Sequence, residues 1–249
     1  MIISPAMLKI FDECPQKYKF MYVDKISLPQ NKYFFEKGKK IHAIASYYIK
    51  GYDVSKLEKA LTEREKQIWN YLTSTEYFKY ELLKSEYQLN MHLEDCWIGG
   101  RLDALVKNGN NYYILDYKTG EIPKNPEHDY QTMIYLLCAD KKIGDFQSLY
   151  FVYLDLKNNT EYKITFTEEL KKEYIQRLST TLNRLTSVTN YKNNKLQNVK
   201  CNCDYYKICS IMWYYNRSSI YLKKNMLKKC YKHAKRWHFS CFCGLLVYV

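Results

Sequence analysis

Apolar side chains recur at helical spacing along the first part of the chain. Ser4 followed by Pro5 marks a helix start, because serine caps a helix N-terminus and proline fits the first helical position. A helix is predicted over residues 5–23, and a second begins near residue 33. A third is predicted over residues 55–72, so the chain opens with a helical region.

The pattern then changes to strand spacing. Over residues 86–93 apolar and polar side chains alternate, which is the period of a half-buried strand. Two further strands are predicted over residues 97–107 and 112–117, separated by the turn Asn108-Gly109-Asn110-Asn111. The three strands are expected to form an antiparallel meander.

Helices and strands alternate through the rest of the regular part. A helix is predicted over residues 129–139, strands over 149–156 and 162–166, and a last helix over 168–185, followed by a polar linker at 190–198. Residues 217–249 carry eight basic residues and no acidic one. We therefore expect one domain over residues 1–216 and a basic, Cys- and His-containing tail over residues 217–249.

The composition favours a nucleic acid as partner. Lys and Arg number 39 against 26 Asp and Glu, a net charge of +13, and 27 tyrosines supply rings that can stack on bases. The alternative is that a Lys-, Asn-, Tyr- and Ile-rich composition reflects an AT-rich coding sequence. Charge alone does not decide between these explanations.

The chain shows neither a signal-peptide pattern nor an apolar run of the ~18 to 20 residues that would span a bilayer. A cytoplasmic protein with no membrane association is expected. In that compartment the nine cysteines are expected to be free thiols or metal ligands rather than disulfides.

Two carboxylates and a lysine carry the candidate chemistry. Asp103 lies on one predicted strand, and Asp116 and Lys118 lie at the end of the next. If the Asn-Gly turn pairs these strands, both carboxylates reach the same face at one end of the sheet. Carboxylate oxygens suit Mg²⁺ or Mn²⁺, which can activate water and neutralise a phosphodiester, and a nearby lysine can position the water.

These residues resemble the PD-(D/E)XK nuclease superfamily, and its RecB-like branch in particular. The resemblance rests on Gly100-Arg101-Leu102-Asp103, on Asp116-Tyr117-Lys118-Thr119-Gly120 and on Gln131-Thr132-Met133-Ile134-Tyr135, in this order. It covers roughly residues 2–209. It implies an α/β fold with a restriction-endonuclease-like core, in which a mixed central β-sheet is flanked by helices.

The resemblance also assigns roles to individual residues. His42 matches an upstream Gly-x-x-x-His segment, so the implied metal ligands are His42, Asp103, Asp116 and the backbone carbonyl of Tyr117. Glu86 matches an acidic position that helps to hold the metal. Gln131 and Tyr135 are expected to contact substrate or to steady Lys118.

Plainer interpretations of the same residues stay open. A lone histidine in a helix is usually structural, and Asp116 with Lys118 could form a surface ion pair. Glu86 could be a solvent-facing strand residue. Tyr135 could be a core aromatic, with or without a role in the site.

Four cysteines at the two ends of this domain form a candidate metal clasp. Cys14 lies near the start, and Cys201, Cys203 and Cys209 lie near the end. They resemble the iron-sulfur clasp of the AddB nuclease domain and of CRISPR-associated RecB-like exonucleases, and imply a [4Fe-4S] cluster. One residue separates Cys201 from Cys203 where that pattern has two, so zinc and no metal remain alternatives.

The sequence therefore predicts a DNA nuclease that depends on Mg²⁺ or Mn²⁺. The resemblance implies an exonuclease acting on single-stranded DNA or DNA ends in recombination, repair or CRISPR adaptation. The alternative is a non-catalytic iron-sulfur nucleic-acid-binding module that serves a helicase or integrase partner. A purely structural, metal-stapled protein would have no need of Asp116 and Lys118.

Overall fold

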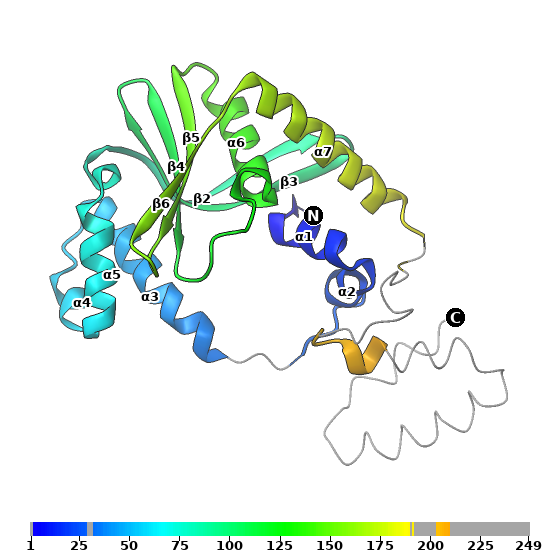
Figure 1. Cartoon of the computed structure of the whole chain (residues 1–249), viewed down its shortest axis with the longest axis horizontal. Coiled ribbons are helices and arrows are strands. Elements are labelled where there is room, and N and C mark those ends of the chain that lie inside the picture. The colour runs from blue at the N-terminus through cyan, green and yellow to red at the C-terminus, as the bar shows by residue number, and fades with distance from the viewer. Residues whose placement is uncertain (1, 29–31, 190, 192–202, 210–249) are drawn as a thin grey trace, which may run out of the picture. The chain divides into compact units, whose positions relative to one another are not determined.

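The computed structural model describes residues 2–28, 32–189, 191 and 203–209 (Figure 1). The chain forms two compact units, Met1–Asn193 and Asn194–Val249, and each is described by itself. The predicted linker at 190–198, except Tyr191, and the basic tail at 217–249 lie outside the described residues. Everything that follows on the sheet and the site concerns the first unit.

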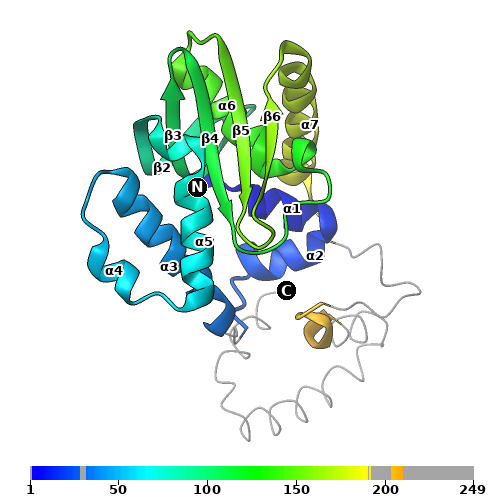
Figure 2. The same cartoon turned by 60° about the vertical axis from the view of Figure 1, so that its left-hand side comes forward.

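A six-stranded mixed sheet forms the centre of this unit, as Figures 1 and 2 show. Its strands are β1 (Ile2–Ile3), β2 (Glu81–Leu93), β3 (Cys96–Asn108), β4 (Asn111–Lys118), β5 (Ser148–Asp155) and β6 (Thr160–Thr165). The order is β1-β3-β4-β5-β6, with β2 along the other edge of β3. The β1–β3 and β4–β5 pairs are parallel and the other pairs antiparallel. The predicted meander is formed by β2, β3 and β4. The connection from β4 to the parallel strand β5 runs through helix α6.

Helices cover both faces of the sheet. They are α1 (Pro5–Glu13), α2 (Pro15–Tyr18), the π-helical turn η1 (Lys19–Val23), α3 (Lys32–Ile49), α4 (Ser55–Lys59), α5 (Glu63–Ser74), η2 (Glu76–Lys79), η3 (Pro126–His128), α6 (Tyr130–Ile143) and α7 (Glu168–Ser187). One apolar core lies between the sheet and α1, α6 and α7, and another between the sheet and α3 and α5. The predicted α/β fold with a mixed sheet flanked by helices is confirmed.

The first predicted helix is wrong as a single element. It breaks at Cys14, which is extended with φ −161° and ψ 101°. The cause is Pro15, because a proline disfavours helical geometry in the residue before it and cannot donate the backbone hydrogen bond. The chain continues as α2 and η1, so Cys14 lies at a corner between two short helices.

The helix predicted over residues 55–72 is also divided. It ends at Lys59 and starts again at Glu63 as α5. Thr62 and Glu65 form a capping box, in which each side chain bonds the other residue's backbone N–H. A capping box marks a helix N-terminus, so a new helix begins at Glu63 although the apolar pattern is continuous.

The first strand was predicted to start at Glu86, and this start is wrong. Glu86 lies in the middle of β2 and has a φ of +50°. The apolar pattern missed residues 81–85 because side chains on both faces of this part are partly buried. A positive φ is strained for a non-glycine residue. On β3 the two neighbours of Asp103 belong to different apolar cores. Leu102 lies in the core with α6, and Ala104 lies in the core with α3 on the other face of the sheet. The sheet is therefore irregular where the candidate site lies.

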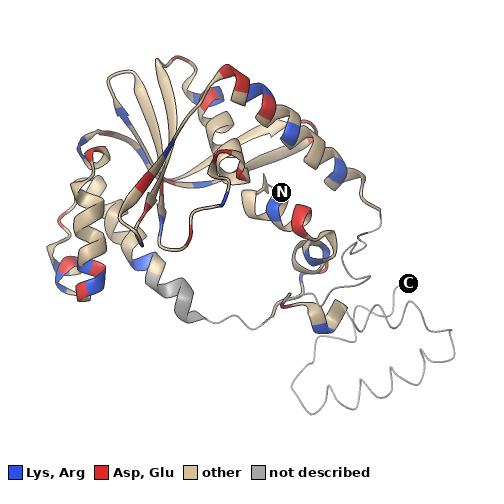
Figure 3. Cartoon of the chain, viewed as in Figure 1, with Lys and Arg blue, Asp and Glu red and all other residues tan. Residues whose placement is uncertain are grey.

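Residues of both charge signs alternate along α7 and occur together on α4 and at the start of α5, as Figure 3 shows. The eight basic residues of the tail account for most of the net charge of +13, and they lie outside the described residues.

Candidate active site

Asp103 links three elements at the end of the sheet where β3 and β4 separate. The last registered pair is Ala104 with Leu115, so Asp103 faces Asp116 just beyond it. Asp103 Oδ2 accepts a hydrogen bond of 2.8 Å from the backbone N–H of Tyr117. Its other oxygen lies 3.0 Å from Nδ1 of His42 on α3. The carboxylate is thus oriented from both sides.

His42 points at this carboxylate from the helix that covers the sheet. Its ring lies edge-on to Tyr117, with the ring centres 5.6 Å apart. Burial alone lowers the pKa of His42, but the hydrogen bond and charge of Asp103 outweigh it and raise the pKa above its usual value. Gly38, one helical turn earlier, would bring a Cβ within 2.9 Å of Thr119 Oγ1, so a glycine lets α3 lie close to the end of β4.

Glu86 completes a compact group of ligand atoms. One atom each of His42, Glu86 and Asp103 lie within 4.8 Å of one another. Glu86 also forms an ion pair with Arg101 of 3.1 Å between Oε2 and Nε. Its strained backbone places this side chain beside His42 and Asp103.

Asp116 is buried at the end of β4, with 6% of its surface exposed. Burial raises its pKa, as does the charge of Asp103, while the ammonium of Lys118 lowers it. Lys118 Nζ lies 2.7 Å from Asp116 Oδ2, so the ammonium pairs with this oxygen. The end of β4 therefore holds a buried carboxylate whose charge is matched by a lysine rather than by solvent.

Gln131, the second residue of α6, joins the carboxylate to the lysine. Its amide nitrogen donates to Asp116 Oδ1, and its amide oxygen accepts a hydrogen bond of 2.9 Å from Lys118 Nζ. The N-cap Asp129 fixes the start of α6 by accepting a hydrogen bond of 2.9 Å from the backbone of Gln131. The amide therefore holds both side chains in one arrangement.

Tyr153 on β5 lies beside the same lysine. The Lys118 ammonium is 5.3 Å from the centre of the Tyr153 ring, a distance at which a ring attracts a cation. The Tyr153 hydroxyl bonds Oγ1 of Thr132 at 2.9 Å. Tyr153 is fully buried. It was not predicted as a site residue, because its place beside Asp116 depends on the pairing of β4 with β5, which the sequence pattern does not reveal.

Tyr135 faces the other side of the site. Its hydroxyl donates a hydrogen bond of 3.0 Å to the backbone oxygen of Arg101, and its ring lies in the core between sheet and α6. A Cβ at Gly100 would stand 2.5 Å from this hydroxyl, so glycine is needed for the approach. Tyr135 holds the strand that carries Arg101 and Asp103, and no described hydrogen bond joins it to Lys118.

The donor set fits a hard divalent cation. Carboxylate oxygens of Glu86 and Asp103 and a nitrogen of His42 form one close group, and the Asp116 carboxylate, outside that group, interacts electrostatically with Asp103 and His42. Mg²⁺ and Mn²⁺ prefer oxygen-rich sites of this kind. A lysine at the same end can meet a negative substrate.

Comparison with protein families matches residues 2–210 to the PD-(D/E)XK nuclease superfamily. The chain belongs to this superfamily. The match covers both strands of the Asp103–Lys118 motif and the helix with Gln131, so the resemblance drawn from the sequence is confirmed. Nucleases of this family use divalent metal ions, and the group of His42, Glu86 and Asp103 gives this nuclease a candidate metal site.

One curated relative and one protein of similar fold bear exonuclease descriptions. The CRISPR-associated exonuclease Cas4 of Francisella tularensis subsp. novicida (strain U112) is 24% identical over 124 residues. These residues are 50% of this chain and 62% of Cas4, so the match spans less than two thirds of that relative. The crystal structure of a presumed exonuclease from Eubacterium rectale superposes with a TM-score of 0.53, at 11% identity, over 83% of this chain and 92% of that one. At that identity it supports the fold alone.

The cysteines of the proposed clasp belong to different units. Cys14, in the first unit, is partly exposed, and its Sγ accepts a 3.4 Å hydrogen bond from the backbone of Lys17. Cys203 and Cys209 lie in the second unit, where Tyr206 N–H bonds the Cys203 oxygen at 2.8 Å in a short helical turn. Cys201 lies outside the described residues.

Among the described helices, none is long and apolar enough to cross a membrane.

Proposed function

We propose that this nuclease hydrolyses DNA phosphodiesters with a bound Mg²⁺ or Mn²⁺. The observation that carries the proposal is the Asp116–Gln131–Lys118 arrangement beside the group of His42, Glu86 and Asp103. A surface ion pair would not need a buried carboxylate and an amide that binds both of its members. The same arrangement argues against a binding module that has lost its catalytic side chains.

Each residue has a stated role in this proposal. His42, Asp103, Asp116 and the backbone carbonyl of Tyr117 hold the cation, and Glu86 helps from β2. The cation, when bound, supplies positive charge for the phosphate and lowers the pKa of a water. Lys118 orients the attacking water or neutralises the phosphate. Gln131 is a positioning residue that keeps Lys118 beside Asp116, and Tyr135 keeps the β3 backbone in place.

The substrate class follows from the relatives and from the composition. Cas4 is described as an exonuclease, and we extend that activity to this chain as acting on single-stranded DNA or free DNA ends. Recombination, repair and CRISPR adaptation are the processes in which such ends arise. A helicase or integrase would be the protein partner that presents them.

A [4Fe-4S] cluster held by Cys14, Cys201, Cys203 and Cys209 is part of the proposal. Four soft thiolates suit such a cluster. It would tie the start of the chain to its end and would have no part in hydrolysis. A folded protein purified anaerobically without iron and without brown colour would remove the cluster and leave the nuclease untouched.

The test is cleavage by wild type and Asp116→Ala, each measured together with DNA binding. We expect wild type to cut labelled DNA with Mn²⁺ or Mg²⁺ and not with EDTA. Asp116→Ala should bind DNA and fail to cut it. Equal cleavage by this variant would refute the proposed site, and a folded wild type that binds DNA without cutting it would favour the binding module.

A further inference from the structure

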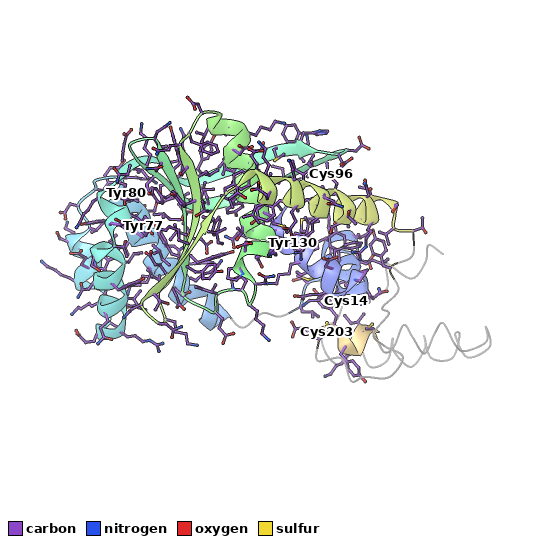
Figure 4. The ribbon with its side chains drawn as sticks, turned by 45° about the horizontal axis from the view of Figure 1, so that its top comes forward. Cys14, Tyr77, Tyr80, Cys96, Tyr130 and Cys203 are labelled. Atoms are coloured by element: carbon purple, nitrogen blue, oxygen red, sulfur yellow. The ribbon has the colours of Figure 1, made fainter. Side chains whose placement is uncertain are left out.

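The hairpin of β2 and β3 extends beyond the rest of the sheet. β2 begins next to Tyr80 and β3 begins at Cys96, and Figure 4 places these two residues at opposite ends of the first unit. Beyond Ala104 the pairing with β4 ends, and only the two residues of β1 flank β3 on that side. We refer to residues 87–102 of this hairpin as the arm.

One face of the arm is packed and the other is open. Leu89, Ile98 and Leu102 point into the core under α1 and α6. The opposite face carries the cross-strand pairs Gln88–Arg101, Asn90–Gly99 and His92–Trp97. Of these, Gln88, His92, Trp97 and Arg101 are exposed. Trp97 keeps 51% of its surface exposed, which is unusual for a large aromatic side chain.

This open face runs directly into the candidate active site. Helix α3 packs on the same side of the sheet at Ser85, where the hydroxyls of Ser46 and Ser85 lie 2.9 Å apart. Next along β2 comes Glu86 of the metal group, and Arg101 forms its ion pair with that residue from the arm. From Trp97 to Asp103 the strand rises roughly 20 Å, at about 3.3 Å per residue.

We propose that the open face of the arm binds single-stranded DNA on its way to the metal site. The ring of Trp97, with His92 edge-on at 5.6 Å between ring centres, is the platform on which a base stacks. Gln88 and the partly exposed Asn90 offer amide groups to the strand, and Gly99, between Trp97 and Arg101, is buried and takes no part. Arg101 meets the phosphate that lies next to the metal site.

The chemistry of the face selects a single strand over a duplex. An exposed ring stacks on a base only when that base is unstacked from its neighbours. Arg101 is the one Lys or Arg side chain among the cross-strand pairs of this face. The face therefore lacks the row of basic residues that would bind the two phosphate backbones of a duplex. Glu94 and Asp95 lie at the hairpin turn and repel phosphate, which marks the outer end of the track.

A structural role for Trp97 is the competing explanation. Cross-strand aromatic pairs such as Trp97 and His92 stabilise hairpins without any ligand. Gly99 also has a structural reason, because a Cβ there would stand 2.2 Å from the backbone oxygen of Leu89. The test therefore needs a readout that hairpin stability does not move.

The experiment measures the dissociation constant of the full chain for an oligo-dT and for a duplex of equal length, by fluorescence anisotropy in EDTA. Trp97→Ala should raise Kd for oligo-dT by about tenfold and leave the duplex value as in wild type, because a stacked base is lost. Tyr162→Ala is the matched control, since Tyr162 is an exposed aromatic, 43% accessible, on the strand at the far edge of the sheet. It should bind oligo-dT as wild type does.

Two further variants keep the test decisive if Trp97→Ala folds poorly. Trp97→Phe keeps a ring and should retain most of the affinity, but lose the tryptophan fluorescence quenching that oligo-dT causes in wild type. Arg101→Gln should reduce the slope of log Kd against log salt by about 0.7, as expected for one lost phosphate contact with a single strand. An unchanged quenching in Trp97→Phe would overturn the stacking role.

The proposal rests on the nuclease function, but the two can fail separately. Unchanged oligo-dT binding by Trp97→Ala, in a protein that cleaves DNA, would overturn the track and leave the nuclease. Equal weakening on oligo-dT and duplex would overturn the single-strand assignment. Trp97-dependent oligo-dT binding by a protein that never cleaves DNA would support the track and refute the nuclease.

Discussion

Lys118 and Gln131 are joined by a hydrogen bond of 2.9 Å between Nζ and Oε1, although Lys118 lies at the end of β4 and Gln131 lies in the first turn of α6. The same amide donates to Asp116. Gln131→Leu keeps the size of the side chain and removes both bonds, so Lys118 and Asp116 lose their common support. We expect kcat to fall by about 10- to 100-fold while DNA binding is retained, as for other partners of site residues.

Steady-state cleavage of labelled DNA measures this effect. Gln176→Ala is the control, because Gln176 is an exposed glutamine on α7 away from the site. A Gln131→Leu variant with the kcat of wild type would show that Lys118 does not depend on this amide.

His42→Ala should weaken metal binding more than it weakens DNA binding. His42 lies 3.0 Å from Asp103 and shares the compact ligand group with Glu86. We expect the Mn²⁺ concentration for half-maximal cleavage to rise by at least about tenfold, because one ligand of the site is lost. His128→Ala, which removes a histidine paired with Glu173 outside the site, should leave it unchanged. A metal titration curve identical to wild type would remove His42 from the ligand set.

Gly100→Ala should destabilise the fold through Tyr135. The added Cβ would meet the Tyr135 hydroxyl at 2.5 Å, and overpacking of this kind costs about 1–3 kcal/mol. Tyr135→Phe removes the hydroxyl, the closest of the atoms that the Cβ would meet, and leaves the ring carbons at 2.9 and 3.1 Å, so the double variant should lose somewhat less stability than the two single variants together. Chemical denaturation of the four proteins measures the coupling. Strict additivity would mean that Gly100 and Tyr135 do not compete for the same space.

The cysteines should differ in their reactivity toward iodoacetamide. Burial raises the pKa of Cys138 to about 12, and burial also raises the pKa of Cys96. A raised pKa protects a thiol from alkylation, because only the thiolate reacts. At pH 8 roughly one Cys138 in ten thousand is ionised. Both should stay unmodified in the folded protein.

Cys14 offers the contrasting case, since it is partly exposed. It should react in chelator-treated protein and be protected in protein purified anaerobically with its iron. Mass spectrometry of the alkylated peptides reports all three residues at once. Equal reaction of Cys14 in both samples would remove it from the cluster.

The motif residues were predictable because short-range spacing carries them. Asp103, Asp116 and Lys118 lie on adjacent strands of a hairpin whose turn is visible in the sequence, and Gln131 follows on the next helix. What spacing did not reveal was the local irregularity. The positive φ of Glu86 and the change of face at Asp103 are set by packing on both sides of the sheet, which a periodic pattern cannot express.

Residues that act through tertiary contact were also missed. Tyr153 reaches Lys118 only because β5 pairs in parallel with β4, a crossover that places residues 37 positions apart side by side. Arg101 belongs to the quoted motif, but its ion pair with Glu86 depends on the register of β2 against β3. The division of the first helix, by contrast, could have been predicted from the sequence. Pro15 disfavours helical geometry at Cys14, and this effect outweighs the helical spacing of the apolar residues.

If Lys118 acts in metal-dependent hydrolysis of DNA, its loss must abolish cleavage while leaving the fold and DNA binding intact. The measurement is cleavage of end-labelled single- and double-stranded DNA by wild type and Lys118→Ala, with Mn²⁺, Mg²⁺ or EDTA. We expect a product ladder from wild type that requires the metal, and no ladder from a Lys118→Ala protein that still folds and binds DNA. Metal-dependent cleavage at the wild-type rate by Lys118→Ala would contradict this role of Lys118.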